Sequence, residues 1–205
     1  MENGRADSLK EAFPGTGRII LASTSPRRRE LLEKIGIAFE VESPEAEESC
    51  RVFPVSCTAL ENAEKKAASI ASKAPGAVVI GADTVIELGS EIIGKPRDPD
   101  DAFRILKRLS GKEHQVATGV CLLRLRDRVM IRFVEKTSVY FRDLPDETVR
   151  RYLTLVDVSD KAGAYAVQEH GEMLVERIEG SLDNVIGLPT ERLAESLSLL
   201  AGTIP

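Results

Sequence analysis

The sequence predicts an α/β protein built on a mixed sheet. Short apolar segments typical of strands alternate with longer segments in which apolar residues recur at helical spacing. Two sharp turns, Gly89-Ser90 and Arg126-Asp127-Arg128, join consecutive strand segments and so add antiparallel pairs to the sheet. The chain has 205 residues, of which 42% are apolar, so it can bury a substantial core as one large domain or two small lobes.

The first elements are predicted from local capping and periodicity. The apolar run 18–22 has the character of a short buried strand, and the polar turn after it leads into a helix. Ser25 is a favourable N-cap, and Pro26 suits the first helical position because no N–H partner is needed there. The alanine-rich segment 56–73 predicts a second helix that ends before Pro75-Gly76.

The middle of the chain predicts a hairpin, a helix and two long strands. The strand 77–88 turns back into 91–94. Asp98 then caps a helix with acidic residues in its first turn and basic residues at its end, the order that the helix dipole favours. Longer strands follow at 114–124 and 130–141. The remaining predicted elements are a helix at 145–155, a strand at 173–178 and a last helix from Thr190.

Three consecutive arginines, Arg27 to Arg29, stand at the start of the first helix, where the helix dipole already places positive potential. Each added cation costs roughly 0.3–1 kcal/mol there unless a negative group occupies the site. Free N–H groups, hydroxyls and guanidinium groups together form a cradle for phosphate. The alternative is that the arginines fan outward into water, which fits Arg29 better than its two neighbours. The cluster predicts binding of a polyanion.

Charge and motifs narrow the class of ligand. The formal net charge is −5, from 28 basic and 33 acidic residues, which gives no support for broad nucleic-acid binding. The basic cluster is therefore local and suits a small phosphorylated molecule. The sequence contains no GxxxxGK[ST], GxGxxG or GxSxG motif, so it indicates neither a P-loop ATPase, a Rossmann dehydrogenase nor a nucleophile elbow.

Cysteine usage and hydropathy predict the compartment. Cys50, Cys57 and Cys121 are odd in number and form no CxxC pair, which is typical of reduced thiols in a cytoplasmic protein. The two histidines lie in no zinc-ligand pattern. We expect residues 1–17 to form a flexible tail, because the segment is polar and lacks the apolar stretch of a signal peptide. No apolar run approaches the length of a membrane span, so we expect no membrane partner.

Further polar positions are candidates for phosphate chemistry. Asp83 stands inside an apolar strand, where a carboxylate is costly to bury unless it is paired, bound to metal or at an open strand end; structural and functional roles are both open. Lys95 follows the hairpin, which brings it toward the same end of the sheet as Asp83, although a solvated loop lysine is the alternative. Lys66 could face either way from its helix. The acidic pair Glu47-Glu48 has the oxygen ligands that Mg²⁺ or Mn²⁺ needs.

An anion cradle, a carboxylate that can serve as base or metal ligand, and supporting lysines fit attack of water on a nucleotide phosphate. From about Arg18 to Leu193, the sequence resembles the Maf family of nucleotide pyrophosphatases. Five motifs match in the right order: Ser23 to Leu32, Gly81 to Thr84, Gly94 to Pro96, Leu109 to Thr118 and Gly187 to Pro189.

The resemblance implies hydrolysis of a nucleoside triphosphate to the monophosphate plus diphosphate, with a divalent cation, Mg²⁺ or Mn²⁺. It implies a mixed, elongated, twisted sheet flanked by helices, similar to inosine triphosphatase, with the active-site cleft between two lobes. Residues 18–205 would form this single catalytic domain. The family also suggests a homodimer.

The resemblance assigns roles by position. Asp83 corresponds to the proton acceptor and, with Glu48, to a metal ligand, Glu47 being the less favoured neighbour. Lys95 corresponds to a catalytic lysine, and Asp160 to a supporting partner or a further metal ligand. The substrate-binding positions are Ser23, Arg27, Arg28, Lys66, Thr84 and Gln168.

The segment Asp160 to Gln168 resembles the family branch that acts on dTTP and UTP. The branch that acts on 7-methyl-GTP usually has Cys-Ala-Gly here and ends in Glu-Gly. The neutral amide of Gln168 can donate to and accept from the edge of a pyrimidine, and Thr84 and Arg27 are the other selectivity positions of this branch. One residue departs from the pattern: Glu169 stands where the family commonly has glycine. If this position needs a positive φ, Glu169 is strained or the loop is rebuilt.

Three functions therefore compete. The first is a dTTP/UTP pyrophosphatase that also clears modified pyrimidine nucleotides, and the second is the same chemistry on 7-methyl-GTP or another modified purine nucleotide. The third is a nucleotide-binding regulator of cell division with little turnover. Asp83, Lys95 and Glu48 argue against the third, because a pure binder needs no catalytic base.

Overall fold

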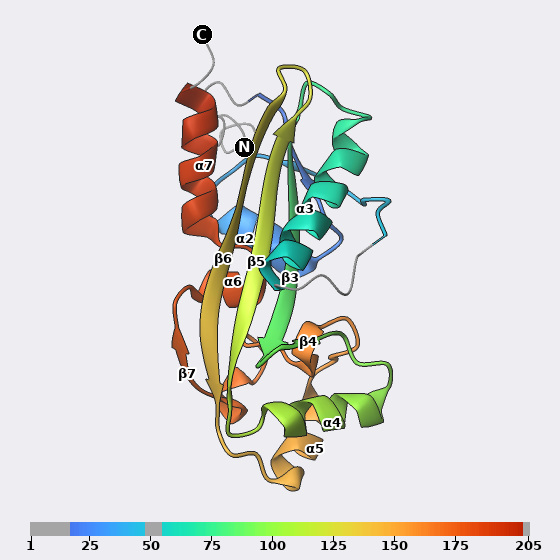
Figure 1. Ribbon diagram of the computed structural model, residues 1–205, viewed down its shortest axis with the longest axis vertical. Coiled ribbons are helices and arrows are strands. Elements are labelled where there is room, and N and C mark those ends of the chain that lie inside the picture. Colours follow the sequence, from blue (N-terminus) through green and yellow to red (C-terminus); the bar gives the residue numbers. More distant parts are fainter. Residues whose placement is uncertain (1–16, 48–54, 203–205) are drawn as a thin grey trace, which may run out of the picture.

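The computed structural model describes residues 17–47 and 55–202, and these form an elongated α/β molecule around one twisted sheet (Figure 1). The strand order is β2-β1-β3-β5-β6-β7, with β4 paired to β3. The β1–β2 and β1–β3 pairs are parallel and the other pairs are antiparallel, so the mixed sheet is confirmed. The strands are β1 (Ile19–Ala22), β2 (Glu40–Glu42), β3 (Val78–Leu88), β4 (Glu91–Ile93), β5 (Glu113–Arg124), β6 (Val129–Phe141) and β7 (Val175–Glu179).

Helices cover both faces of this sheet. They are α2 (Pro26–Lys34), α3 (Val55–Ala71), α4 (Pro99–Leu109), α5 (Asp146–Leu155), α6 (Leu182–Ile186) and α7 (Thr190–Gly202), with short 3₁₀ turns η1 (Ala162–Ala164) and η2 (Gly171–Met173). At one end of the long strands, α3 packs on one face while α2 and α7 pack on the other; α4 and α5 lie at the opposite end (Figure 1).

Separate hydrophobic cores give the molecule two lobes that share β3, β5 and β6. In the first lobe, alternate residues of β3 enter different layers: Val78 and Ile80 pack with α2 and α7, whereas Val79 packs with α3. In the second lobe, residues of α4 and α5 such as Leu106 and Tyr152 pack against the far ends of the same strands. The long strands therefore hold the two lobes in a fixed relation.

The edge of β3 is interrupted between the lobes. Its pairing with β1 ends at Gly81, and its pairing with β4 begins at Ile86. Among the described strands, none pairs with residues 82–85 on this edge. Asp83 lies in this gap, within the strand and paired on its other edge with Gly119 of β5.

Local sequence signals account for most element boundaries. Asp98 caps α4 by accepting a hydrogen bond from the Asp101 N–H at 2.6 Å, as predicted. Ser25 occupies the N-cap position of α2, but its side chain makes no capping bond; its own N–H donates to Ser23 Oγ at 3.1 Å. The short elements β2 and α6 are not predicted by the sequence pattern, and β7 begins two residues later than expected because η2 precedes it.

Some predictions fall wholly or mostly outside the described residues, namely the flexible tail at 1–17 and the role of Glu48. No helix within the described ranges has both the length and the apolar character required to cross a bilayer.

Candidate active site

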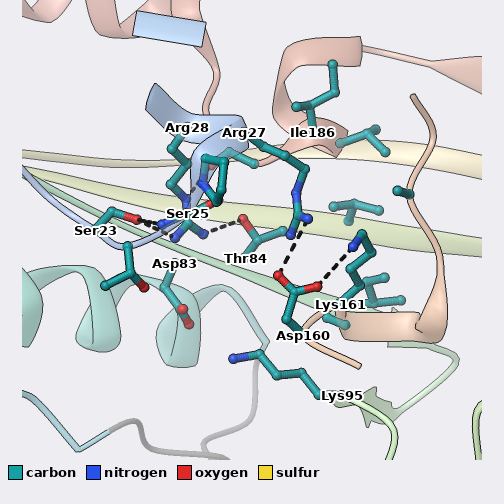
Figure 2. A pocket seen from close by; sticks show the side chains of 18 of the residues that line it. Ser23, Ser25, Arg27, Arg28, Asp83, Thr84, Lys95, Asp160, Lys161 and Ile186 are labelled. Carbon is teal, nitrogen blue, oxygen red and sulfur yellow. Dashed lines mark hydrogen bonds and ion pairs between the residues drawn. The ribbon is translucent and has the colours of Figure 1, made fainter. Parts of the chain in front are cut away.

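A cavity of about 340 Å³ opens at the gap in the β3 edge, between the two lobes. Figure 2 shows Arg27 and Arg28 entering it from α2, Lys95 and Asp160 from the second lobe, and Asp83 between them. All the predicted site residues that the structure describes, apart from Glu47, line this one cavity. They are Ser23, Arg27, Arg28, Lys66, Asp83, Thr84, Lys95, Asp160 and Gln168.

Asp83 is buried beneath α3 and paired there. Its carboxylate accepts hydrogen bonds from Lys66 Nζ at 2.7 Å and from Asn62 Nδ2 at 2.9 Å, and the residue is 6% exposed. Asn62 and Lys66 are four residues apart, so both project from the same face of α3. The opposite charge and two hydrogen bonds offset the cost of burying the carboxylate. Lys66, whose direction the sequence left open, faces Asp83.

Asn62 is a site residue that the sequence analysis missed. The available signal was its spacing from Lys66, because two polar residues at i and i+4 interrupt a helix face that is otherwise rich in alanine.

Two glycines allow α3 to lie close to the sheet. A Cβ on Gly81 would stand 2.8 Å from the Ala67 nitrogen and closer still to the Ala63 carbonyl, and one on Gly119 would meet the backbone of Ala59. The absence of these side chains brings the α3 backbone near enough for Lys66 to reach Asp83. Gly81 therefore accommodates the close approach of a helix of the chain itself.

Arg28 is fixed on the opposite face of β3. Its Nε donates to the Gly187 carbonyl at 2.9 Å, and its Nη2 donates to Thr84 Oγ1 at 3.1 Å. A longer contact of 3.4 Å joins Nη1 to Ser23 Oγ (Figure 2). Thr84 Oγ1 is also 2.9 Å from Thr118 Oγ1. Because consecutive strand residues point to opposite faces, Asp83 meets α3 while Thr84 meets Arg28. The guanidinium group is thus held in place before any ligand arrives.

Arg27 reaches across the cavity mouth to the second lobe. Its Nη1 lies 3.7 Å from Asp160, and Lys161 Nζ lies 3.0 Å from the same carboxylate (Figure 2). Partial burial opposes ionisation of Asp160, but the hydrogen bond from Lys161 and the charge of Arg27 outweigh it and lower the pKa of this carboxyl. Arg29 instead points outward and pairs with Glu33, so fanning into water is correct for Arg29 alone.

Lys161 is a second residue that the sequence analysis missed. It lines the cavity, is only 8% exposed and lies within the segment that resembles the pyrimidine branch. The sequence contains no sign that Lys161 is buried at the cavity, because a lysine next to an aspartate is most often exposed to solvent.

The part of the cavity near Gln168, a predicted base-selecting residue, is more open. Gln168 lines the cavity but is exposed, as is Lys95, whereas Tyr165 and Ala166 also line it and are buried. Among the described non-glycine residues, positive φ occurs at Arg128, Ala164 and His170, and therefore not at Glu169. The strain considered for Glu169 is absent, and the left-handed turn falls on the following residue.

Comparison with known proteins identifies the family. A family model described as Maf-like protein matches residues 18–200. The chain belongs to the Maf family. A protein named dTTP/UTP pyrophosphatase from Aquifex aeolicus is 46% identical over 189 residues, covering 91% of this chain and 98% of that protein. The protein of the same name from Ruminiclostridium cellulolyticum is 41% identical over 186 residues, covering 89% of this chain and 95% of that one.

The fold has a more distant solved relative. The Staphylococcus aureus Ham1 protein superimposes with a TM-score of 0.51 at 14% identity, covering 89% of this chain and 99% of that one. This likeness concerns the arrangement of the sheet and helices, and it confirms the fold class expected from the family resemblance.

A divalent cation fits this site only in part. Within residues 17–47 and 55–202, no three His, Cys, Asp or Glu side chains gather closely enough to hold a metal ion. Asp83 already accepts from Lys66 and Asn62, and Asp160 is paired with Lys161 and Arg27. Mg²⁺ is commonly held by one or two carboxylates together with substrate phosphates. The donor set therefore suits a cation that arrives on a triphosphate better than a resident one.

Proposed function

We propose that this Maf family protein hydrolyses dTTP and UTP to the monophosphate plus diphosphate. The observation that carries the proposal is a buried, positioned carboxylate, Asp83, in the same cavity as the cationic start of α2. The names of the relatives at 41–46% identity support the same activity.

The triphosphate would lie against the start of α2, where Arg27, Arg28 and the Ser23 hydroxyl lie beside the first turn of the helix. Lys95 approaches from the second lobe and would stabilise the departing diphosphate together with Lys66. This arrangement places positive charge where negative charge develops as the phosphate bond breaks. The fixed position of Arg28 means that little reorganisation is needed when substrate binds.

In the proposed reaction, Asp83 accepts a proton from a water molecule as the water oxygen bonds to the α-phosphorus. The bond from that phosphorus to the oxygen bridging to the β-phosphorus breaks, and diphosphate leaves with the bonding electrons. Lys66 and Asn62 keep the carboxylate oriented within the gap at the β3 edge. Asp83 acts as a general base.

A Mg²⁺ or Mn²⁺ ion would enter as part of the substrate and neutralise phosphate charge. Asp83 and Asp160 are the described carboxylates that line the cavity and could add a ligand to it. Chelation with EDTA should then abolish turnover.

Selection of the base is proposed at the outer end of the cavity. The amide of Gln168 can match both donor and acceptor groups of a pyrimidine edge. Tyr165 and Ala166 form a wall next to it, and Thr84 lies beneath Arg28 toward the phosphate end.

The direct test is diphosphate release by the wild type and by Asp83→Asn, with Mg²⁺ or Mn²⁺ present. We expect the substitution to lower kcat by about 10²–10⁴-fold while nucleotide binding is largely kept, as for loss of a general base. Asp100→Asn is the matched control, because Asp100 is an exposed residue of α4 that does not line the cavity. A near-normal rate in Asp83→Asn would reject its assignment as the base.

A panel of nucleotides separates the competing functions. We expect dTTP and UTP to be the best substrates. Preference for 7-methyl-GTP or another modified purine would reject the pyrimidine assignment and keep the reaction. Tight binding without diphosphate release from any member of the panel would instead favour a nucleotide-binding regulator.

A further inference from the structure

The wall of the cavity at its base-binding end is a segment with a constrained backbone. Gly163 and Ala164 both have left-handed conformations, with φ of 73° and 57°. An alanine in this region is held there only when its surroundings fix it. The next residues, Tyr165 to Gln168, line the cavity. Contacts with neighbouring elements therefore fix the conformation of this segment.

One such contact comes from Tyr152 of α5, which is fully buried and does not itself line the cavity. Its hydroxyl accepts a hydrogen bond from the Ala166 N–H at 2.9 Å and donates one to the Ala166 carbonyl at 3.3 Å. Both polar groups of a single cavity-wall residue are thus held by one side chain. Burial raises the pKa of Tyr152 to about 12, so the proton that it donates is retained throughout the neutral range.

The second contact comes from His114 of β5, which is 1% exposed. Its Nε2 lies 2.9 Å from the Tyr165 hydroxyl, and Phe141 packs edge-on against both rings, with centroids 4.9 Å from His114 and 5.0 Å from Tyr165. Burial lowers the pKa of His114 to about 4 and raises that of Tyr165, so both partners are neutral at neutral pH.

His114 and Tyr152 therefore hold neighbouring residues of the same wall, and neither is among the residues that line the cavity. We propose that Tyr152 and His114 are positioning residues that set the choice of nucleobase by holding the Tyr165–Ala166 segment. This inference rests on the proposed function, because it concerns which base that site accepts. The segment that lines the cavity can discriminate between nucleobases only if its polar groups are held in place, because a mobile segment can adapt to several bases.

The chemistry at the phosphate end does not depend on this support. The Asp83, Lys66 and Asn62 contacts are made by β3 and α3, and Arg28 is held by Thr84 and Gly187. Loss of the wall contacts should therefore weaken base selection while leaving the hydrolytic step nearly intact.

The experiment compares Tyr152→Phe with the wild type. The substitution removes both hydrogen bonds to Ala166 and keeps the buried ring. We expect KM for dTTP and UTP to rise about tenfold with kcat changed less than about threefold, the loss expected for one or two hydrogen bonds. The preference for dTTP over dCTP and 7-methyl-GTP should fall by a similar factor. Tyr140→Phe is the matched control, since its hydroxyl bonds to exposed Glu179.

Binding of products supplies a readout that needs no turnover. Calorimetry with dTMP, UMP, dCMP and 7-methyl-GMP should show the same loss of discrimination in Tyr152→Phe, whereas inorganic diphosphate, which has no base, should bind both proteins equally. If the wild type releases no diphosphate from any nucleotide, the proposed function fails, and the monophosphate series still decides this inference.

Unchanged base discrimination in Tyr152→Phe would overturn the proposal. An equal loss of affinity for every monophosphate and for diphosphate would also overturn it, because that outcome marks a general structural defect. If Tyr152→Phe does not fold, Tyr165→Phe tests the same idea, since it removes only the His114 hydrogen bond and retains the ring contacts with Phe141.

Discussion

Asp83 and Lys66 form a buried ion pair in the site. Both side chains are 9% exposed, so water screens their interaction poorly. Removing two charges from water is costly, and their attraction repays this only with good geometry and further hydrogen bonds. The 2.7 Å contact and the added bond from Asn62 meet both conditions. The arrangement holds the Asp83 carboxylate in a defined orientation and adds little net stability.

Lys66→Met should therefore destabilise the protein. Loss of the ammonium leaves Asp83 buried without its counter-charge, which we expect to lower the free energy of unfolding by about 3–5 kcal/mol. Urea denaturation measures this change. In the double variant Lys66→Met with Asp83→Asn, most of the loss should be recovered, because the uncompensated charge is gone. Equal destabilisation of the single and double variants would contradict this account.

Among the elements, α3 decides the geometry of the site, because it carries both partners of Asp83. Its distance from the sheet is set by Gly81 on β3 and Gly119 on β5, where backbone of α3 occupies the space that a side chain would take. The close packing of one helix thus controls the position of the proposed catalytic group, which belongs to a neighbouring strand.

Gly81→Ala should shift α3 away from β3. The added methyl would overlap the Ala63 carbonyl and the Ala67 nitrogen, so we expect destabilisation of about 1–3 kcal/mol, as for overpacking of a core. Activity should fall as well, because Lys66 and Asn62 move with the helix. Thermal denaturation and kcat/KM for dTTP measure the two effects. Gly76→Ala is the control, since its added Cβ would meet no atom within 4 Å, and a similar loss there would argue against the packing explanation.

At the scale of the whole molecule, the sheet serves two lobes at once. β3, β5 and β6 run through both, and the interrupted edge of β3 leaves the cavity where the lobes meet. The cavity gathers cations from α2, α3 and the second lobe in a chain whose net charge is −5. The positive charge of this cleft is therefore a local property that the net charge of the chain does not show.

Burial of His114 in the second lobe should make global stability depend on pH. Its pKa falls from 6.5 to about 4 on folding, so the unfolded chain binds more protons between these values. The contribution of His114 to stability is then fully present above pH 6.5 and is lost as the pH falls toward 4. We expect the His114 contribution to lower the free energy of unfolding by about 2 kcal/mol between pH 7 and pH 5. Urea titrations at both values measure it, and His114→Gln should show a smaller decrease; equal decreases would contradict the assignment.

The sequence by itself determined the features that depend on near neighbours. The Asp98 cap, the start of α2 at Pro26 and the continuous apolar run of β3 are local signals, because each reflects contacts within a few residues. The family resemblance added the candidate positions of the site. It could not show which of them touch one another.

Tertiary structure alone decided those contacts. The bond from Arg28 to the Gly187 carbonyl joins residues 159 positions apart, and Asn62 acquires its role only because α3 packs over Asp83. The short elements β2 and α6 likewise escaped prediction, because partners distant in sequence stabilise them. A sequence pattern records the preferences of neighbouring residues, whereas the site depends on the packing of segments that meet only when the whole sheet has formed.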